Sequence, residues 1–79
     1  MNPFDIIIDD KVYEYIDSIL LNDKYYVAFM DDDATYIKEY KIKNNNIELY
    51  DIDDNLAETI WEMIKWKYKI FITTLLQHV

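Results

Sequence analysis

Carboxylate side chains are the most abundant groups in this sequence that could do chemistry, and one stretch spaces them as calcium-binding loops do. Asp51, Asp53, Asn55 and Glu62 occupy the first, third, fifth and twelfth places of such a loop, which binds the ion through oxygen ligands. Leu56 stands where the sharp turn of the loop requires glycine, and no helix is predicted to lead into the stretch. We therefore interpret it as the acidic N-terminus of a helix and predict neither a metal nor another cofactor.

Groups suited to acid–base or nucleophilic catalysis are scarce. His78 is the only histidine, Ser18 is the only serine, and there is no cysteine. A penultimate histidine is typical of a frayed terminal side chain rather than of a catalytic group. The lack of glycine also excludes the loops that hold phosphate groups in nucleotide-binding enzymes. Pairs of Asp and Glu are the one open route to catalysis, but a glycosidase cleft is difficult to build in 79 residues. We expect a protein that is not an enzyme.

The charge balance restricts the partners. Sixteen Asp and Glu against eight Lys give a net charge of −8. This excess disfavours direct binding to nucleic acid or to anionic membranes, and it favours a basic protein partner. Tyrosines can stack on single-stranded bases, but such platforms need a basic groove, so we assign them to packing. The sequence shows neither a signal peptide nor a membrane-spanning run, and we expect a cytoplasmic location, in a bacterium or in its host if a phage encodes the protein.

Small clusters of Asn and Asp recur about every ten residues and predict the turns. In a chain without glycine, these two residue types best tolerate left-handed backbone angles. The clusters separate runs of β-branched and aromatic residues, which are typical of short strands. We predict one domain over residues 1–79, beginning with an antiparallel β-meander of five strands at about 4–9, 12–21, 24–30, 35–43 and 47–52.

From Asp54 onward the apolar residues follow the period of a helix. Asn55 followed three residues later by Glu58 resembles a capping box, in which two side chains bond the first free amides of a helix. We predict a helix over about 55–76, packed on one face of the sheet, and therefore an α+β fold. Residues 65–72 also alternate as a strand would, but no turn cluster separates them from the helix, which favours one continuous helix.

Such a helix is apolar around more of its circumference than one sheet face covers. Aromatic residues beyond what a core absorbs are typical anchors of protein interfaces. A homodimer is the simplest explanation because twofold pairing requires only one patch, and a sheet edge folded onto the same surface is the alternative. We thus predict a small acidic protein-interaction module that self-associates through its C-terminal helix. The predicted contact residues are Trp61, Trp66, Tyr68 and Ile72.

The acidic clusters support an alternative function, a nucleic-acid mimic that occupies the DNA- or RNA-binding groove of a basic enzyme, as phage inhibitors of restriction or CRISPR enzymes do. A mimic must space its carboxylates as phosphates are spaced and face them the same way. Successive turns of a meander alternate between its ends, so the first turn, the third turn and the helix start are expected at one end. The predicted acidic surface comprises Asp9, Asp10, Asp31, Asp32, Asp33, Asp53 and Asp54.

The order of these parts also carries a family resemblance, through Ile6-Ile7-Ile8-Asp9-Asp10, Val12-Tyr13-Glu14-Tyr15, Tyr25-Tyr26-Val27-Ala28-Phe29, Tyr36-Ile37-Lys38-Glu39-Tyr40, Ile47-Glu48-Leu49 and the Asp-rich helix start. This succession resembles the YrzB-like small acidic proteins of low-GC Gram-positive bacteria over about residues 4–64. The chain departs from the family pattern in lacking glycine and in its apolar tail after Trp66. The family has no established activity, so the resemblance implies an antiparallel sheet with a helix and no functional residues.

Overall fold

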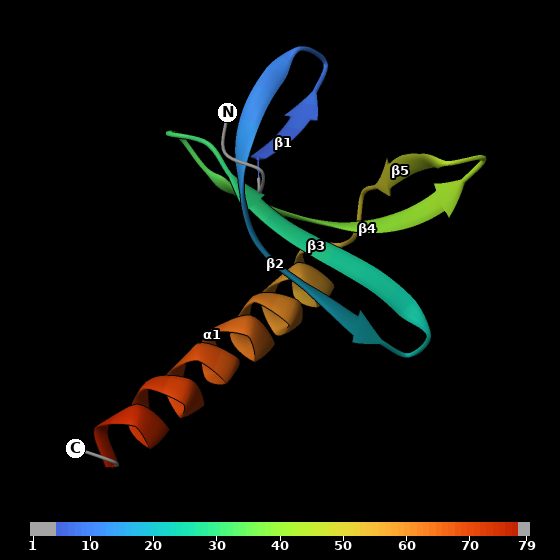
Figure 1. Ribbon diagram of the computed structural model, residues 1–79. Helices are drawn as coiled ribbons and strands as arrows, with labels where there is room; N and C mark the ends of the chain where they lie inside the picture. The colour runs from blue at the N-terminus through green and yellow to red at the C-terminus, as the bar shows by residue number, and fades with distance from the viewer. Residues whose placement is uncertain (1–4, 78–79) are drawn as a thin grey trace.

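The computed structural model describes residues 5–77, with side chains described to residue 69, and shows one curled antiparallel sheet followed by one helix (Figure 1). The strands are adjacent in chain order. They are β1 (Asp5–Ile8), β2 (Lys11–Leu21), β3 (Lys24–Met30), β4 (Thr35–Lys43) and β5 (Asn46–Tyr50), and the helix is α1 (Asp54–Gln77). The predicted α+β meander is confirmed. The predicted start of the first strand at Phe4 and the terminal His78 lie outside the described residues.

Three of the four connections between strands are two-residue turns in which both residues have positive φ, as type I′ turns require. This turn type matches the right-handed twist of the strands that it joins. Asn and Asp adopt these angles more readily than other residues with a side chain, which is how a chain without glycine forms tight hairpins. The turn residues and their φ angles are Asp9 50°, Asp10 65°, Asn22 52°, Asp23 64°, Asn44 52° and Asn45 66°.

A β-bulge in β2 brings the sheet into contact with the middle of α1. Ile16 is the extra residue, because the pairing with β3 shifts between Tyr15 and Asp17. The Tyr68 hydroxyl donates a hydrogen bond of 3.3 Å to the Ile16 carbonyl. Beside it, Lys67 Nζ lies 2.9 Å from an oxygen of Asp17. These two contacts hold α1 against the bulge. Residues 65–72 are not a strand, because α1 runs without a break from Asp54 to Gln77.

The core lies between α1 and one face of the sheet. Ile60 and Ile64 are fully buried and pack against Tyr26 and Ala28 of β3. The small side chain of Ala28, itself 0% exposed, leaves room for the helix to approach the sheet closely. Figure 1 shows the first turns of α1 lying against the sheet and its last turns extending beyond it. Partly buried apolar side chains surround this core, namely Ile16, Ile19, Leu21, Ile37, Ile52, Leu56 and Trp61.

The N-terminus of α1 is capped by Asp53. The Leu56 amide donates a hydrogen bond of 2.8 Å to the Asp53 carboxylate, and the Ala57 amide donates one of 3.0 Å to the Asp53 carbonyl. These are the contacts of an N-cap residue. The predicted capping box of Asn55 and Glu58 is therefore wrong, because Asn55 already lies within the helix. The sequence pattern placed the cap two residues too late.

Replacing Asp53 with Ala is expected to lower the free energy of unfolding by about 1 kcal/mol, because the Leu56 amide loses its partner. Urea unfolding followed by circular dichroism measures this change. Asn55→Ala is the matched control, since Asn55 is exposed and its side chain does not cap the helix in this assignment. An equal loss of stability in the two variants would contradict the assignment of Asp53 as the cap.

Candidate protein-binding surface

The contact residues predicted on the helix do not share one side of it. Trp61 is partly buried and packs against the core. Tyr68 faces the sheet, where its hydroxyl bonds the bulge carbonyl. Trp66 is 60% exposed, with Lys69 Nζ 5.6 Å from the centre of its ring. The side chain of Ile72 lies outside the described residues. Of the aromatic residues that the sequence pattern assigned to a partner, Trp61 thus packs against the core, whereas Tyr68 bonds the sheet and stays 44% exposed.

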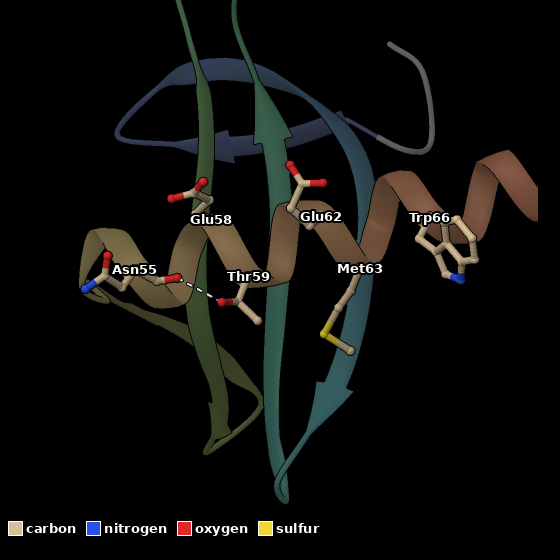
Figure 2. Close-up of a pocket in the computed structure, with 6 residues that line it drawn as sticks. All are labelled: Asn55, Glu58, Thr59, Glu62, Met63 and Trp66. Atoms are coloured by element: carbon tan, nitrogen blue, oxygen red, sulfur yellow. Dashed lines mark hydrogen bonds between the residues drawn. The ribbon is translucent and has the colours of Figure 1, made fainter.

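The outward side of α1 carries a shallow hollow (Figure 2). All its lining side chains come from this one helix, so no second element forms a wall. In Figure 2 the two glutamates point to one side, and Met63 and Trp66 point to the other. Within residues 5–77, no helix is both long and apolar enough to cross a membrane. The lining residues are Asn55, Glu58, Thr59, Glu62, Met63 and Trp66.

The sheet face opposite α1 is not covered by any other element of residues 5–77, and we call it the open face (Figure 1). In Figure 1 the β1–β2 and β4–β5 hairpins lie on either side of β3, and α1 lies on the opposite side of the sheet from these hairpins. The curl of the sheet makes the two edge strands, β1 and β5, line one groove of about 540 Å³. Its lining residues come from all five strands and are Asp5, Ile6, Ile7, Ile8, Tyr15, Ser18, Val27, Phe29, Tyr40, Ile42, Ile47 and Leu49.

The groove has a buried apolar floor and an exposed apolar wall. Val27 and Phe29 form the floor and point away from α1, because they alternate along β3 with Tyr26 and Ala28. Ile42 and Ile47 are cross-strand partners in the β4–β5 hairpin, and they are 69% and 68% exposed. Contiguous exposed apolar side chains beside a groove are typical of interaction sites. The open face is therefore our candidate for a protein-binding surface.

Aromatic side chains hold the floor of the groove in a fixed arrangement. The Phe29 ring centre lies 5.3 Å from that of Tyr13 and 5.5 Å from that of Tyr36. Farther along the sheet, the rings of Tyr25 and Tyr40 are 5.6 Å apart. Such ring pairs add to the stability that burial alone supplies. The tyrosines pack across strands, as the sequence pattern predicts.

Asp31 organises the loop between β3 and β4. One of its carboxylate oxygens accepts hydrogen bonds of 2.9 Å from the amides of Asp33 and Ala34. The other accepts a bond of 2.8 Å from Lys11 Nζ and one of 3.2 Å from the Tyr36 hydroxyl. The Lys11 ammonium and the two amides hold the pKa of the Asp31 carboxyl far below its ordinary value. The Asp31 side chain is only 7% exposed, and its bonds stabilise the loop.

The structure links two of the three acidic clusters through one ion pair, although Asp9 and Asp10 do not line the same hollow as Asp31, Asp32 and Asp33. The ion pair between Lys11 and Asp31 joins the first turn, which contains Asp9 and Asp10, to the β3–β4 loop. An acidic hollow of about 460 Å³ lies at this end of the sheet and shares Asp5 with the groove of the open face. The carboxylates that line this acidic hollow are those of Asp5, Glu14, Asp31, Asp32 and Asp33.

The third acidic cluster lies elsewhere. Strand β5 ends at Tyr50, which pairs with Glu39 in the middle of β4 rather than with its first residue, Thr35. The chain then passes to the helix side of the sheet, where Asp53 caps α1 and Asp54 is its first residue. The expected gathering of all three clusters at one end therefore does not occur.

The carboxylates that resemble a calcium loop each have another role. Asp51 forms an ion pair with Lys38, and Glu62 forms one of 2.8 Å with Lys65. Asp53 caps the helix. Across the part of the chain that the structure describes, no three His, Cys, Asp or Glu side chains are grouped to hold a metal ion.

The groove residues were not among the predicted site residues. The signal in the sequence was the alternation that places Tyr40 and Ile42 of β4 on the same face as their partners Leu49 and Ile47 of β5. That alternation identifies an apolar face but does not say whether the helix covers it. The sheet register and the position of α1 supply the answer.

No match was found when the chain was compared with protein-family models, with curated proteins and with solved structures, so the resemblance to YrzB-like proteins stays a prediction.

Proposed function

We propose that this protein is a non-enzymatic protein-binding module and that the open face binds the partner. The observation that carries the proposal is the groove lined by all five strands, with Ile42 and Ile47 exposed along one wall. Burying an exposed isoleucine side chain contributes on the order of 1.5–3 kcal/mol. Large apolar side chains in and around a pocket are the usual anchors of a protein interface.

The charge of the protein supports a basic partner. The net charge is −8, so two copies would bring together −16, which is twice −8. The acidic hollow adjoins the groove through Asp5, which places carboxylates beside the apolar surface. A basic protein is attracted by this field and docks faster than a neutral one. Self-association through α1 has less support, because Trp61 packs against the core and the Tyr68 hydroxyl bonds the sheet.

Nucleic-acid mimicry is the alternative that one observation favours. The Lys11–Asp31 ion pair links the turn that contains Asp9 and Asp10 to the loop that contains Asp32 and Asp33. All four are exposed. However, Asp31 is neutralised by Lys11, and the cluster around Asp53 lies apart. A mimic of this fold would therefore present a shorter acidic surface than the sequence pattern predicts.

Matched variants on different surfaces test the proposal. The double variant Ile42→Thr/Ile47→Thr removes apolar surface from the open face and keeps residues that favour strands. Trp66→Gln removes apolar surface from the outward side of α1. Immobilised wild-type protein captures its partner from a lysate, and titration calorimetry then measures the affinity of each variant. We expect the double variant to lose at least about tenfold in affinity and Trp66→Gln to keep the wild-type value.

Two results would overturn the proposal. Loss of the partner in Trp66→Gln alone would place the interface on α1, as the sequence pattern predicts. Loss in Asp32→Asn/Asp33→Asn alone, with a partner that DNA or high salt displaces, would indicate a nucleic-acid mimic. Circular dichroism of every variant shows that the fold is intact before affinities are compared.

A further inference from the structure

We infer that the occupant of the open face is an amphipathic α-helix of the partner, with an apolar side and flanking lysines or arginines. This inference rests on the proposed function and adds the shape and chemistry of the bound segment. It is carried by the form of the groove, by the length of the edge strands and by the distribution of charge around the apolar floor.

The form of the groove suits a helix. Because β1 and β5 both line it, the groove is a trough bounded by the two edges of a curled sheet. Four gaps between neighbouring strands make the sheet roughly 19 Å wide along its backbone. A helix with its side chains is about 10–12 Å wide, and β3 is long enough, at roughly 23 Å, to lie under about four helical turns.

The edge strands argue against the other common way in which a sheet binds a peptide. Addition of a strand depends on main-chain hydrogen bonds along a free edge. Within residues 5–77 the edge strands are short, with four residues in β1 and five in β5. The exposed apolar side chains lie instead along the wall of the trough, at Ile42 and Ile47, beside the floor of Val27 and Phe29. A partner that buries this surface must enter the trough.

The charges around the trough specify basic flanks. The two strand lysines whose register places them on the open face are already paired, Lys11 with Asp31 and Lys38 with Asp51. The adjoining acidic hollow carries the exposed carboxylates of Asp32 and Asp33. Lysines or arginines beside the apolar side of a bound helix would meet this acidic end. A second copy of this chain would bring carboxylates to the same place.

Synthetic peptides of about 18 residues, made only of leucine and lysine in equal numbers, test this inference by fluorescence anisotropy. In the first peptide the leucines follow the helical period, and in the second they alternate strictly with lysine, as in a strand. A third peptide keeps the helical pattern and replaces lysine with glutamate. We expect the helical Leu/Lys peptide to bind at least about tenfold more tightly than either of the others. We also expect Ile42→Thr/Ile47→Thr to weaken it by a similar factor and Trp66→Gln to leave it unchanged.

Equal binding of the helical and alternating peptides would overturn the inference, as would binding that is insensitive to the open-face variant and disappears in high salt. The single variant Ile47→Thr replaces the double variant if the latter does not fold. If the captured protein partner depends on Ile42 and Ile47 while the helical peptide does not bind, the proposed function stands and this inference fails. If neither depends on these residues, both fail.

Discussion

Replacing Ile60 with Ala is expected to lower the free energy of unfolding by about 2–5 kcal/mol. Ile60 is 0% exposed and lies where α1 meets Tyr26 and Ala28 of β3. Removing its outer carbons loses the free energy gained by burying them and leaves a cavity that the tightly packed helix cannot close. A domain of this size has a free energy of unfolding of roughly 4–12 kcal/mol, so the variant is expected to lose a large part of its stability.

Urea unfolding followed by tryptophan fluorescence measures this loss, because Trp61 packs against the same core. Met63→Ala is the matched control, since Met63 lies on the outward side of the same helix. It is expected to change stability by less than about 1 kcal/mol. Equal losses in the two variants would show that α1 does not pack on the sheet through the side that contains Ile60.

Replacing Asp31 with Asn is expected to lower the melting temperature at neutral pH, and the difference from the wild type is expected to shrink in acid. The variant keeps the shape of the side chain but loses the charge that pairs with Lys11. Asparagine has one accepting oxygen where aspartate has two. Its amide nitrogen, which only donates, replaces either the oxygen that accepts from Lys11 or the oxygen that accepts from the amides of Asp33 and Ala34. The loop that joins β3 to β4 is therefore expected to be less stable in the variant.

The pH dependence follows from the lowered pKa of Asp31. Its ordinary pKa is 3.8, and in the folded protein it is well below that value. As the pH falls through about 3.8, the unfolded chain takes up a proton that the folded chain does not, so the wild type loses the stability that this carboxylate supplies. The Asp31 carboxylate makes its full contribution to the free energy of unfolding above about pH 5, and this contribution decreases at lower pH.

Thermal unfolding of the wild type and Asp31→Asn between about pH 7 and pH 3 measures this difference. Asp32→Asn is the control, because Asp32 is exposed in the same loop. A difference between wild type and Asp31→Asn that stays constant over this range would contradict the role of the charged carboxylate. So would an equal effect of Asp32→Asn.

Much of the fold could be predicted because local signals agree with it. The Asn and Asp clusters fall at the turns, where they supply the positive φ angles that no glycine is present to supply. The helical period after Asp54 identifies α1. The cap was misplaced because Asp53, Asp54 and Asn55 are all good N-cap residues, and only the hydrogen bond to Leu56 selects among them.

The candidate site could not be predicted because it depends on contacts between elements that are distant in sequence. The bulge at Ile16 gives Tyr68 a carbonyl to bond, so the hydroxyl of a half-exposed aromatic residue of the helix is tied to the sheet. Ile42 and Ile47 look like ordinary strand residues in the sequence. They become candidates only when the sheet curls and α1 covers its other face.

The most direct test of the open face is methyl NMR of the protein with labelled isoleucine, valine and methionine, titrated with the captured basic partner. We predict that the methyl signals of Val27, Ile42 and Ile47 shift or broaden, because these residues line the groove. The signal of Met63, on the outward side of α1, is predicted to stay in place. Movement of the Met63 signal while the three groove signals stay unchanged would contradict the assignment of the open face as the binding surface.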